Sequence, residues 1–133
     1  TVSKTSGSAI CSASDLARRL GDRVVVLKKG EKDIIASSSS DTIIQCDTQG
    51  SFRRCGGQGD VLSGVLAAFC AWYHRKDSLH SSAPEEDLGV SIAFASAHIL
   101  RIASRKAFEL KGRSMLASDV LSCVPEAFHT FLS

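Results

Sequence analysis

The stretch RRCGGQGD at positions 53–60 sets three glycines and a carboxylate side by side. Because glycine has no side chain, the backbone N–H groups of such a loop can approach a ligand closely. The apolar sequence from Val61 onward predicts a helix, whose first N–H groups are unpaired and carry partial positive charge. Such a helix start favours phosphate, or the charge that develops during phosphoryl transfer. Asp60 stands where a carboxylate can take a proton from an attacking hydroxyl, so the segment predicts an anion site and a base.

This glycine motif has a structural interpretation as well as a functional one. A tight turn between a sheet and a helix also favours glycine, but two glycines satisfy that need. The third glycine, the acid at the helix start and Gly64 favour the functional interpretation. Asp60 alone is compatible with simply complementing the helix dipole, worth ~0.3–1 kcal/mol, although the glycines before it favour the base. The motif is neither a Walker A sequence nor a dinucleotide-binding fingerprint.

Four further polar residues near these segments have two interpretations each. Lys29, with Gly30, follows a predicted strand, and ligands of α/β folds bind where strands end; a solvated lysine in a hairpin is equally compatible. Arg53 and Arg54 either contact phosphate or keep the loop soluble, and for Arg53 we favour the second. Cys55 lies near the helix start, but no histidine close in sequence serves as its base, which disfavours a cysteine nucleophile.

Composition indicates a globular protein and excludes several classes. The chain has 133 residues, 44% of them hydrophobic, and a net charge of +2, so nothing predicts nucleic-acid binding. No apolar run approaches the ~20 residues that span a bilayer. Five scattered cysteines without a C-x-x-C pair, and histidines without ligand spacing, predict neither a disulfide scaffold nor a metal site. We therefore expect an intracellular compartment, cytoplasmic or mitochondrial. The sequence does not begin with Met, and we expect it to begin inside a longer chain.

The first half of the sequence predicts a short helix and an antiparallel meander. The helix is expected over Asp15–Leu20, capped by Ser12 or Ser14 and stopped by Gly21. A buried strand should follow over Arg23–Lys28, because these residues are β-branched, continuous and too few for a helix. Turns then separate two more strands at a sheet edge, Asp33–Ala36 and Thr42–Cys46.

The second half predicts three helices. The first, Asp60–His74, is apolar nearly all round and should be central and buried, with Trp72 and Tyr73 in the core and Gly64 permitting close approach. After a polar linker at 76–85 containing Pro84, a second helix is expected over Glu86–Leu110, with His98 in the core. Its apolar stripe comprises Ile92, Ala95, Ala97, Ile99, Leu100, Ile102 and Ala103. A third, Asp119–Leu132, should be capped by Ser118 and kinked at Pro125.

Three stretches carry a family likeness: Val25–Ile35 (VVLKKGEKDII), Arg53–Gly64 (RRCGGQGDVLSG) and Lys111–Val120 (KGRSMLASDV). Together they resemble the ATP-dependent NAD(P)H-hydrate dehydratases of the ribokinase-like superfamily, eukaryotic type. The likeness covers about residues 10–132; G-x-G-D alone indicates only the superfamily. It implies an α/β fold in which residues 1–133 are the C-terminal portion of a single ribokinase-like domain: edge strands in a meander, then the glycine-loop helix and two further helices.

The resemblance also implies a reaction. The family is a lyase of metabolite repair, removing water from the (S)-hydrate of NADH or NADPH at the expense of ATP. It implies that Asp60 is the catalytic base and also touches the hydrate, and that no residue here is a metal ligand, Mg²⁺ bridging the ATP phosphates. The ATP-binding residues that it implies are Lys29, Gly30, Glu31, Lys32, Asp33, Gly50, Ser51, Phe52, Arg53, Arg54, Cys55, Gly56, Gly57, Gln58 and Gly59.

The resemblance carries further expectations about partners and completeness. Family members have a longer N-terminal part that holds much of the central sheet, so we expect this chain to be inactive alone. Functional pairing with NAD(P)H-hydrate epimerase and a homo-oligomer are implied, but neither nucleic acid nor membrane. Two alternatives stay open: a ribokinase-like kinase of small-molecule hydroxyls, whose phosphoester would last, and a non-catalytic nucleotide-binding module.

Overall fold

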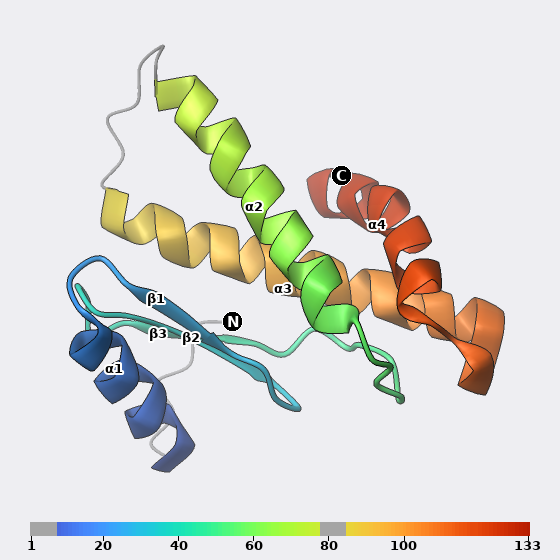
Figure 1. The fold of residues 1–133 in the computed structure, drawn as a ribbon, viewed down its shortest axis with the longest axis horizontal. Helices are drawn as coiled ribbons and strands as arrows, with labels where there is room; N and C mark the ends of the chain where they lie inside the picture. Colours follow the sequence, from blue (N-terminus) through green and yellow to red (C-terminus); the bar gives the residue numbers. More distant parts are fainter. Residues whose placement is uncertain (1–7, 78–84) are drawn as a thin grey trace. The chain divides into compact units, whose positions relative to one another are not determined.

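The computed structural model describes the backbone of residues 8–77 and 85–133, and the side chains of residues 13–73 and 88–133. The chain divides into two compact units, Thr1–Asp47 with Leu79–Phe94 and Thr48–Ser78 with Ala95–Ser133. The predicted linker with Pro84 falls largely on residues 78–84, outside the described residues. Within them the fold is a mixed α/β arrangement of four α-helices and one three-stranded sheet (Figure 1).

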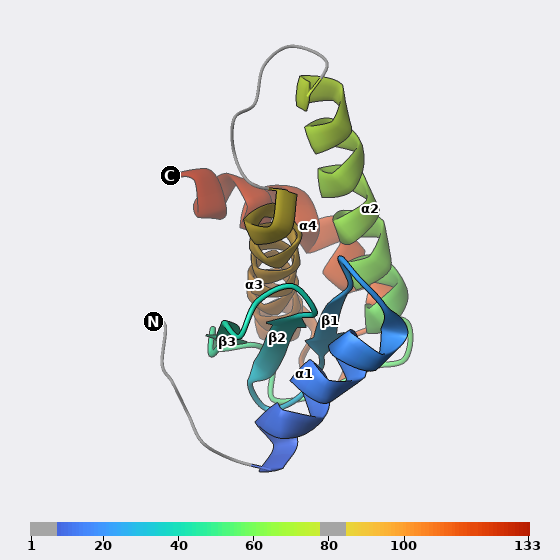
Figure 2. The ribbon, with the colours of Figure 1, turned by 90° about the vertical axis from the view of Figure 1, so that its left-hand side faces the viewer.

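The first unit confirms the predicted meander. Strands β1 (Val25–Lys28), β2 (Asp33–Ser37) and β3 (Ile43–Cys46) pair antiparallel in the order β1-β2-β3. Leu27 lies opposite Ile35, which in turn lies opposite Ile44. Helix α1 (Ser8–Leu20) packs against β1 and β2 (Figure 2). The side chains of Ile35 and Ala36 are fully buried, so the centre of this unit lies along β2.

Three expectations for this unit need correction. Helix α1 begins at Ser8 rather than Asp15, so Ser12 and Ser14 lie inside the helix and do not cap it. The longer helix buries Ala13 and Ala17, one turn apart on the same face. Strand β1 begins at Val25 because Arg23 adopts a left-handed φ of 58°, and β1 is half-buried rather than buried. Gly21, with a φ of +127°, ends α1 as predicted.

The second unit contains helix α2 (Gln58–Asp77), the C-terminal part of α3 (Glu85–Lys111), a 3₁₀ turn at Gly112–Ser114 and α4 (Ala117–Leu132). Its core confirms most of the predicted apolar stripe on α3: Ala95, Ala97, Ile99, Leu100, Ile102 and Ala103 are buried. Met115, Val120 and Ala127 are buried as well. Cα atoms of α2 and α4 approach each other closely, and these two helices lie beside one another in Figure 1.

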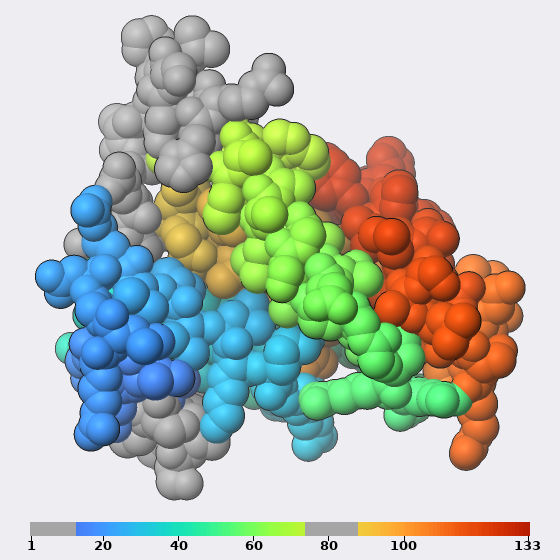
Figure 3. All heavy atoms as spheres, in the orientation of Figure 1, coloured from blue at the N-terminus to red at the C-terminus, as the bar shows by residue number. Residues whose placement is uncertain are grey.

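Helix α2 contradicts the prediction of a buried central helix. Among its described side chains only Leu62 is buried, and Trp72 is 52% exposed. Figure 3 shows atoms of α2 at the surface of its unit. A Cβ atom at Gly64 would meet no described atom within 4 Å, so among the described residues this glycine permits no close approach. An all-round apolar helix needs cover on every side, but the described side chains of α2 other than Leu62 are half-buried or exposed.

The start of α4 also differs from expectation. The helix begins at Ala117 with Leu116 as its N-cap residue, so Ser118 lies inside the first turn and is not the cap. Asp119 performs the capping, because its Oδ2 accepts a hydrogen bond of 2.8 Å from the N–H of Leu116. The expected acid in the first turn is thus confirmed. Pro125 lies inside the helix, and its kink stays a prediction.

Candidate active site

The glycine loop ends in a tight turn that starts α2. Gly57 has a φ of +87°, a backbone conformation that residues other than glycine rarely adopt. Its carbonyl oxygen accepts hydrogen bonds from the N–H groups of Asp60 at 3.1 Å and Val61 at 3.2 Å. A Cβ atom at Gly57 would lie only 2.9 Å from Cβ of Ala117. Both the backbone conformation and the packing against α4 therefore require glycine here.

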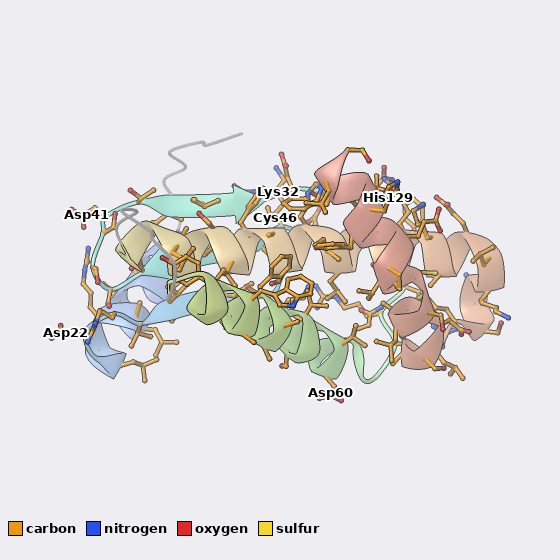
Figure 4. All side chains as sticks on the ribbon, turned by 90° about the horizontal axis from the view of Figure 1, so that it is seen from above. Asp22, Lys32, Asp41, Cys46, Asp60 and His129 are labelled. Carbon is orange, nitrogen blue, oxygen red and sulfur yellow. The ribbon has the colours of Figure 1, made fainter. Side chains whose placement is uncertain are left out.

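The other two glycines and Asp60 face open space. A Cβ at Gly56 or Gly59 would meet no described atom within 4 Å. The N–H groups of Gln58 and Gly59 belong to the first turn of α2, where a helix supplies no acceptor. Asp60 is exposed at the same helix start and points outward (Figure 4). The loop thus combines accessible amide donors, which can bind an anion, with one carboxylate, which can accept a proton from a ligand.

Gln58 shows one unusual feature of the loop. Its side chain is half-buried, and its Nε2 atom is fully buried with no acceptor among the described residues. A buried donor without an acceptor costs free energy, of the order of 1–3 kcal/mol. The amide therefore calls for an acceptor that the described residues do not provide.

The segment before the glycines is held by α3 in the same unit. Thr48 Oγ1 and His98 Nδ1 are hydrogen-bonded at 2.6 Å, and Arg101 donates from a guanidinium N–H to the carbonyl oxygen of Thr48 at 3.0 Å. The N–H of Ser51 donates to Ser104 Oγ at 3.4 Å. Sequence reasoning missed Thr48, Arg101 and Ser104 entirely. The predicted core histidine is half-buried and bonded, and burial, together with the nearby Arg105 charge, lowers its pKa.

The second predicted group, Lys29–Asp33, forms the β1–β2 turn of the first unit. Asp33 is fully buried and accepts hydrogen bonds from the N–H of Gly30 at 3.0 Å and from Lys29 Nζ at 3.3 Å. A Cβ at Gly30 would lie 2.7 Å from the carbonyl oxygen of Lys32. Glu31 and Lys32 are exposed. The buried Asp33 therefore stabilises the turn through its hydrogen bonds, whereas Lys29, Glu31 and Lys32 lie at the surface.

The remaining predicted residues are distributed along the loop. Arg53 and Arg54 are exposed, and Cys55 is half-buried with a free thiol. Phe52 is 86% exposed, and its ring packs edge-on against that of Phe108, with 6.1 Å between the ring centroids. Across residues 13–73 and 88–133 no three His, Cys, Asp or Glu side chains gather in a way that could hold a metal ion. No helix in the described part of the chain is long and apolar enough to cross a membrane.

Comparison with known proteins identifies the family of the chain. The family profile of NAD(P)H-hydrate dehydratase matches residues 3–126. Relatives named ATP-dependent (S)-NAD(P)H-hydrate dehydratase occur in Heterostelium pallidum, 37% identical over 89% of this chain, and in Drosophila pseudoobscura, 42% identical over 84%. The relative of that name in Arabidopsis thaliana is 39% identical over 84% of this chain.

The chain therefore belongs to the NAD(P)H-hydrate dehydratase family, whose fold is ribokinase-like. It covers 30% of the Heterostelium and Arabidopsis relatives and 35% of the Drosophila one, about a third of their length. The expected family and fold class are confirmed.

Proposed function

We propose that the protein carrying these residues is an ATP-dependent dehydratase that restores NADH or NADPH from its (S)-hydrate. The single observation that carries the proposal is the start of α2, where open glycine amides and the exposed carboxylate of Asp60 meet in a chain of this family. The relatives' names specify ATP and the hydrate as reactants. We assign ATP to the residues from Gly50 to Gly59; a role of Lys29–Asp33 in ATP binding is a separate expectation that the family resemblance implies.

The proposed reaction begins at the hydroxyl group of the hydrated nicotinamide ring. Asp60 takes the hydroxyl proton while the oxygen attacks the γ-phosphorus of ATP, forming a phosphoester and releasing ADP. The amides of Gly56, Gly57 and Gly59 stabilise the charge on the transferring group. Phosphate then leaves with the electrons of the carbon–oxygen bond, driven by the lone pair of the ring nitrogen. Loss of a ring proton restores the dihydronicotinamide.

Magnesium fits this site as a partner of the nucleotide. Mg²⁺ keeps several waters and binds phosphates with only one or two protein carboxylates. Waters and the phosphate oxygens of the nucleotide would supply its ligands, and no residue of this chain is assigned as one. When bound, the ion neutralises charge on the phosphates. Pairing with NAD(P)H-hydrate epimerase, which would supply the (S)-hydrate from its epimer, and a homo-oligomer belong to the same proposal.

The test uses the 133-residue chain and a hybrid enzyme. In the hybrid, this chain replaces the aligned segment of the Drosophila pseudoobscura relative. We expect the chain alone to bind ATP without turnover, and the hybrid to convert NADPH-hydrate and ATP into NADPH, ADP and phosphate. Near-ultraviolet absorbance of the dihydronicotinamide and released ADP are the readouts. A lasting phosphorylated product would instead identify a kinase, and ATP binding without turnover by the hybrid a non-catalytic module.

A further inference from the structure

We propose that His98, Arg101, Ser104 and Phe108 form a positioning stripe on α3 that holds the glycine loop in place for ATP, with Arg101 as its principal member. This inference rests on the proposed function, because it names ATP as the ligand of the loop. The four residues follow one another at spacings of three, three and four along the helix. Such spacing places them on one face of α3.

The stripe matches residues 48–52 in order. Thr48 bonds to His98 and Arg101, and Ser51 bonds to Ser104. A Cβ built at Gly50 would touch Cγ of Arg101 at 3.6 Å and Oγ of Ser104 at 3.5 Å. Because each step along the loop corresponds to a step along α3, residues 48–52 run beside this face of the helix.

The anchored segment leads directly into the residues assigned to ATP. Ser51 Oγ donates a hydrogen bond to the carbonyl oxygen of Arg53, which extends the ordered segment toward the glycines. At the other end, the Gly57 carbonyl is bonded to the first turn of α2. Residues 53–56 therefore span a short interval between two fixed ends. A loop that is fixed before ligand arrives loses less conformational entropy on binding.

Arg101 has the central place in the stripe. Its half-buried guanidinium donates to the backbone carbonyl of Thr48, and its aliphatic stem lies against Gly50. Ser104, which is 6% exposed, donates from Oγ to the carbonyl oxygen of Arg101 and accepts from Ser51. A hydrogen bond from a charged donor contributes more than a neutral one. Removing the guanidinium should therefore release the loop more than removing the Ser104 hydroxyl.

The experiment compares Arg101→Met, Arg101→Lys and Ser104→Ala in the 133-residue chain, with Arg105→Met as the matched control. Arg105 lies on the same helix, but its ion pair is with Glu109 at 3.8 Å, outside the loop. Hydrogen exchange of the amides at positions 50–59 reports loop order, and calorimetric titration with ATP reports affinity. Both are measured at about pH 7.5, above the ordinary histidine pKa, so that His98 stays neutral.

We expect Arg101→Met to raise the exchange rate at positions 50–59 roughly tenfold, and to lower the affinity for ATP roughly tenfold as well. Arg101→Lys should restore part of both effects, Ser104→Ala should give a smaller change in the same direction, and Arg105→Met should give none. Exchange in α4 serves as the measure of global folding. If Arg101→Met unfolds α4, Ser104→Ala decides the question.

Loop exchange that is unchanged in both Arg101→Met and Ser104→Ala would overturn the positioning role. Exchange that speeds up in α4 as much as at positions 50–59 in both variants, and that Arg101→Lys does not restore, would also overturn it, since that pattern indicates general destabilisation. The two proposals fail differently. Absence of ATP binding by the unsubstituted chain and by the hybrid contradicts the proposed function, whereas the exchange measurement decides whether the stripe orders the loop.

Discussion

The carbonyl oxygen of Gly57 accepts the N–H of Asp60 at 3.1 Å, so the turn that bends the glycine loop also fixes the backbone of the proposed base. The relationship depends on a left-handed residue, because Gly57 has a φ of +87°. It also depends on close packing against Ala117. The anion site and the base are consequently parts of one turn.

Gly57→Ala and Gly59→Ala should have opposite effects on stability. The first substitution strains a left-handed backbone and pushes a methyl group against Ala117, which should lower the free energy of unfolding by about 1–3 kcal/mol. The second adds a methyl group in open space in the first turn of α2, so stability should stay the same or rise by up to ~1 kcal/mol. Urea unfolding measures both. Equal destabilisation by the two variants would contradict the assigned geometry.

Gly59→Ala also tests whether ATP approaches the loop. Since its methyl group would meet no described protein atom, any loss of ATP affinity must come from the ligand side. We expect ATP binding at least about tenfold weaker, because the methyl group occupies space that a phosphate needs beside the amides. Titration with ATP measures this effect. Unchanged affinity would place the nucleotide elsewhere.

The β1–β2 turn should depend on the buried carboxylate of Asp33. Asp33→Ala removes the acceptor of the Gly30 N–H and of Lys29, and should lower the free energy of unfolding by about 1–3 kcal/mol. Asp33→Asn keeps an acceptor oxygen for Gly30 and should cost less. Lys29→Met should cost least, because the lysine side chain is 37% exposed and Asp33 keeps the hydrogen bond from the N–H of Gly30. Thermal unfolding of the three variants gives the order, and a reversed order would refute the role of Asp33.

His98 should make stability depend on pH. Burial, and then the charge of Arg105, lowers its pKa from the ordinary 6.5, so the unfolded chain takes up a proton at higher pH than the folded chain. The contribution of neutral His98 to the free energy of unfolding is therefore fully present above pH 6.5. It is lost as pH falls from there toward the lowered pKa of the folded chain. Urea unfolding at about pH 7.5 and about pH 5.5 measures the effect. Between these two values the free energy of unfolding should fall more for the unsubstituted chain than for His98→Asn. Identical losses would exclude this contribution.

Thiol reactivity should follow burial. Cys70 is exposed, whereas Cys123 is 7% exposed, and burial, followed by the charges of Glu126 and Asp119, raises the pKa of its thiol against an opposing effect of Lys106. Because the thiolate is the reactive form, Cys70 should react with a thiol reagent well before Cys123. Peptide mapping after timed labelling measures the order in which these two thiols react. Early labelling of Cys123 would contradict the packing of α4.

Local signals in the sequence predicted the features that depend on few residues. Gly21 ends α1, Asp119 stands in the first turn of α4, and the three strands form the expected meander. Each depends on backbone conformations or hydrogen bonds between close neighbours. The turn at the glycines and the position of Asp60 at the start of α2 were predictable for the same reason, since glycine freedom and helix starts are local properties.

Features that depend on distant residues were not predictable. Arg101 lies 53 positions from Thr48, and nothing in their sequence surroundings indicates that they meet. The apolar composition of α2 predicted burial, yet Trp72 is 52% exposed because composition does not specify which neighbours cover a helix. Ser118 is a favourable capping residue by type, but Asp119 captures the N–H of Leu116 and sets the helix start two residues earlier.

The central claim is that Asp60 is the base of an ATP-dependent dehydration, and Asp60→Asn in the hybrid enzyme tests it most directly. The amide cannot accept the hydroxyl proton, so the rate of NADPH formation should fall by at least about a hundredfold while ATP affinity is retained. The control, Asp119→Asn, alters the equivalent first-turn acid of α4 and should leave the rate unchanged. Dehydration by Asp60→Asn at a rate close to that of the unsubstituted hybrid would contradict the account.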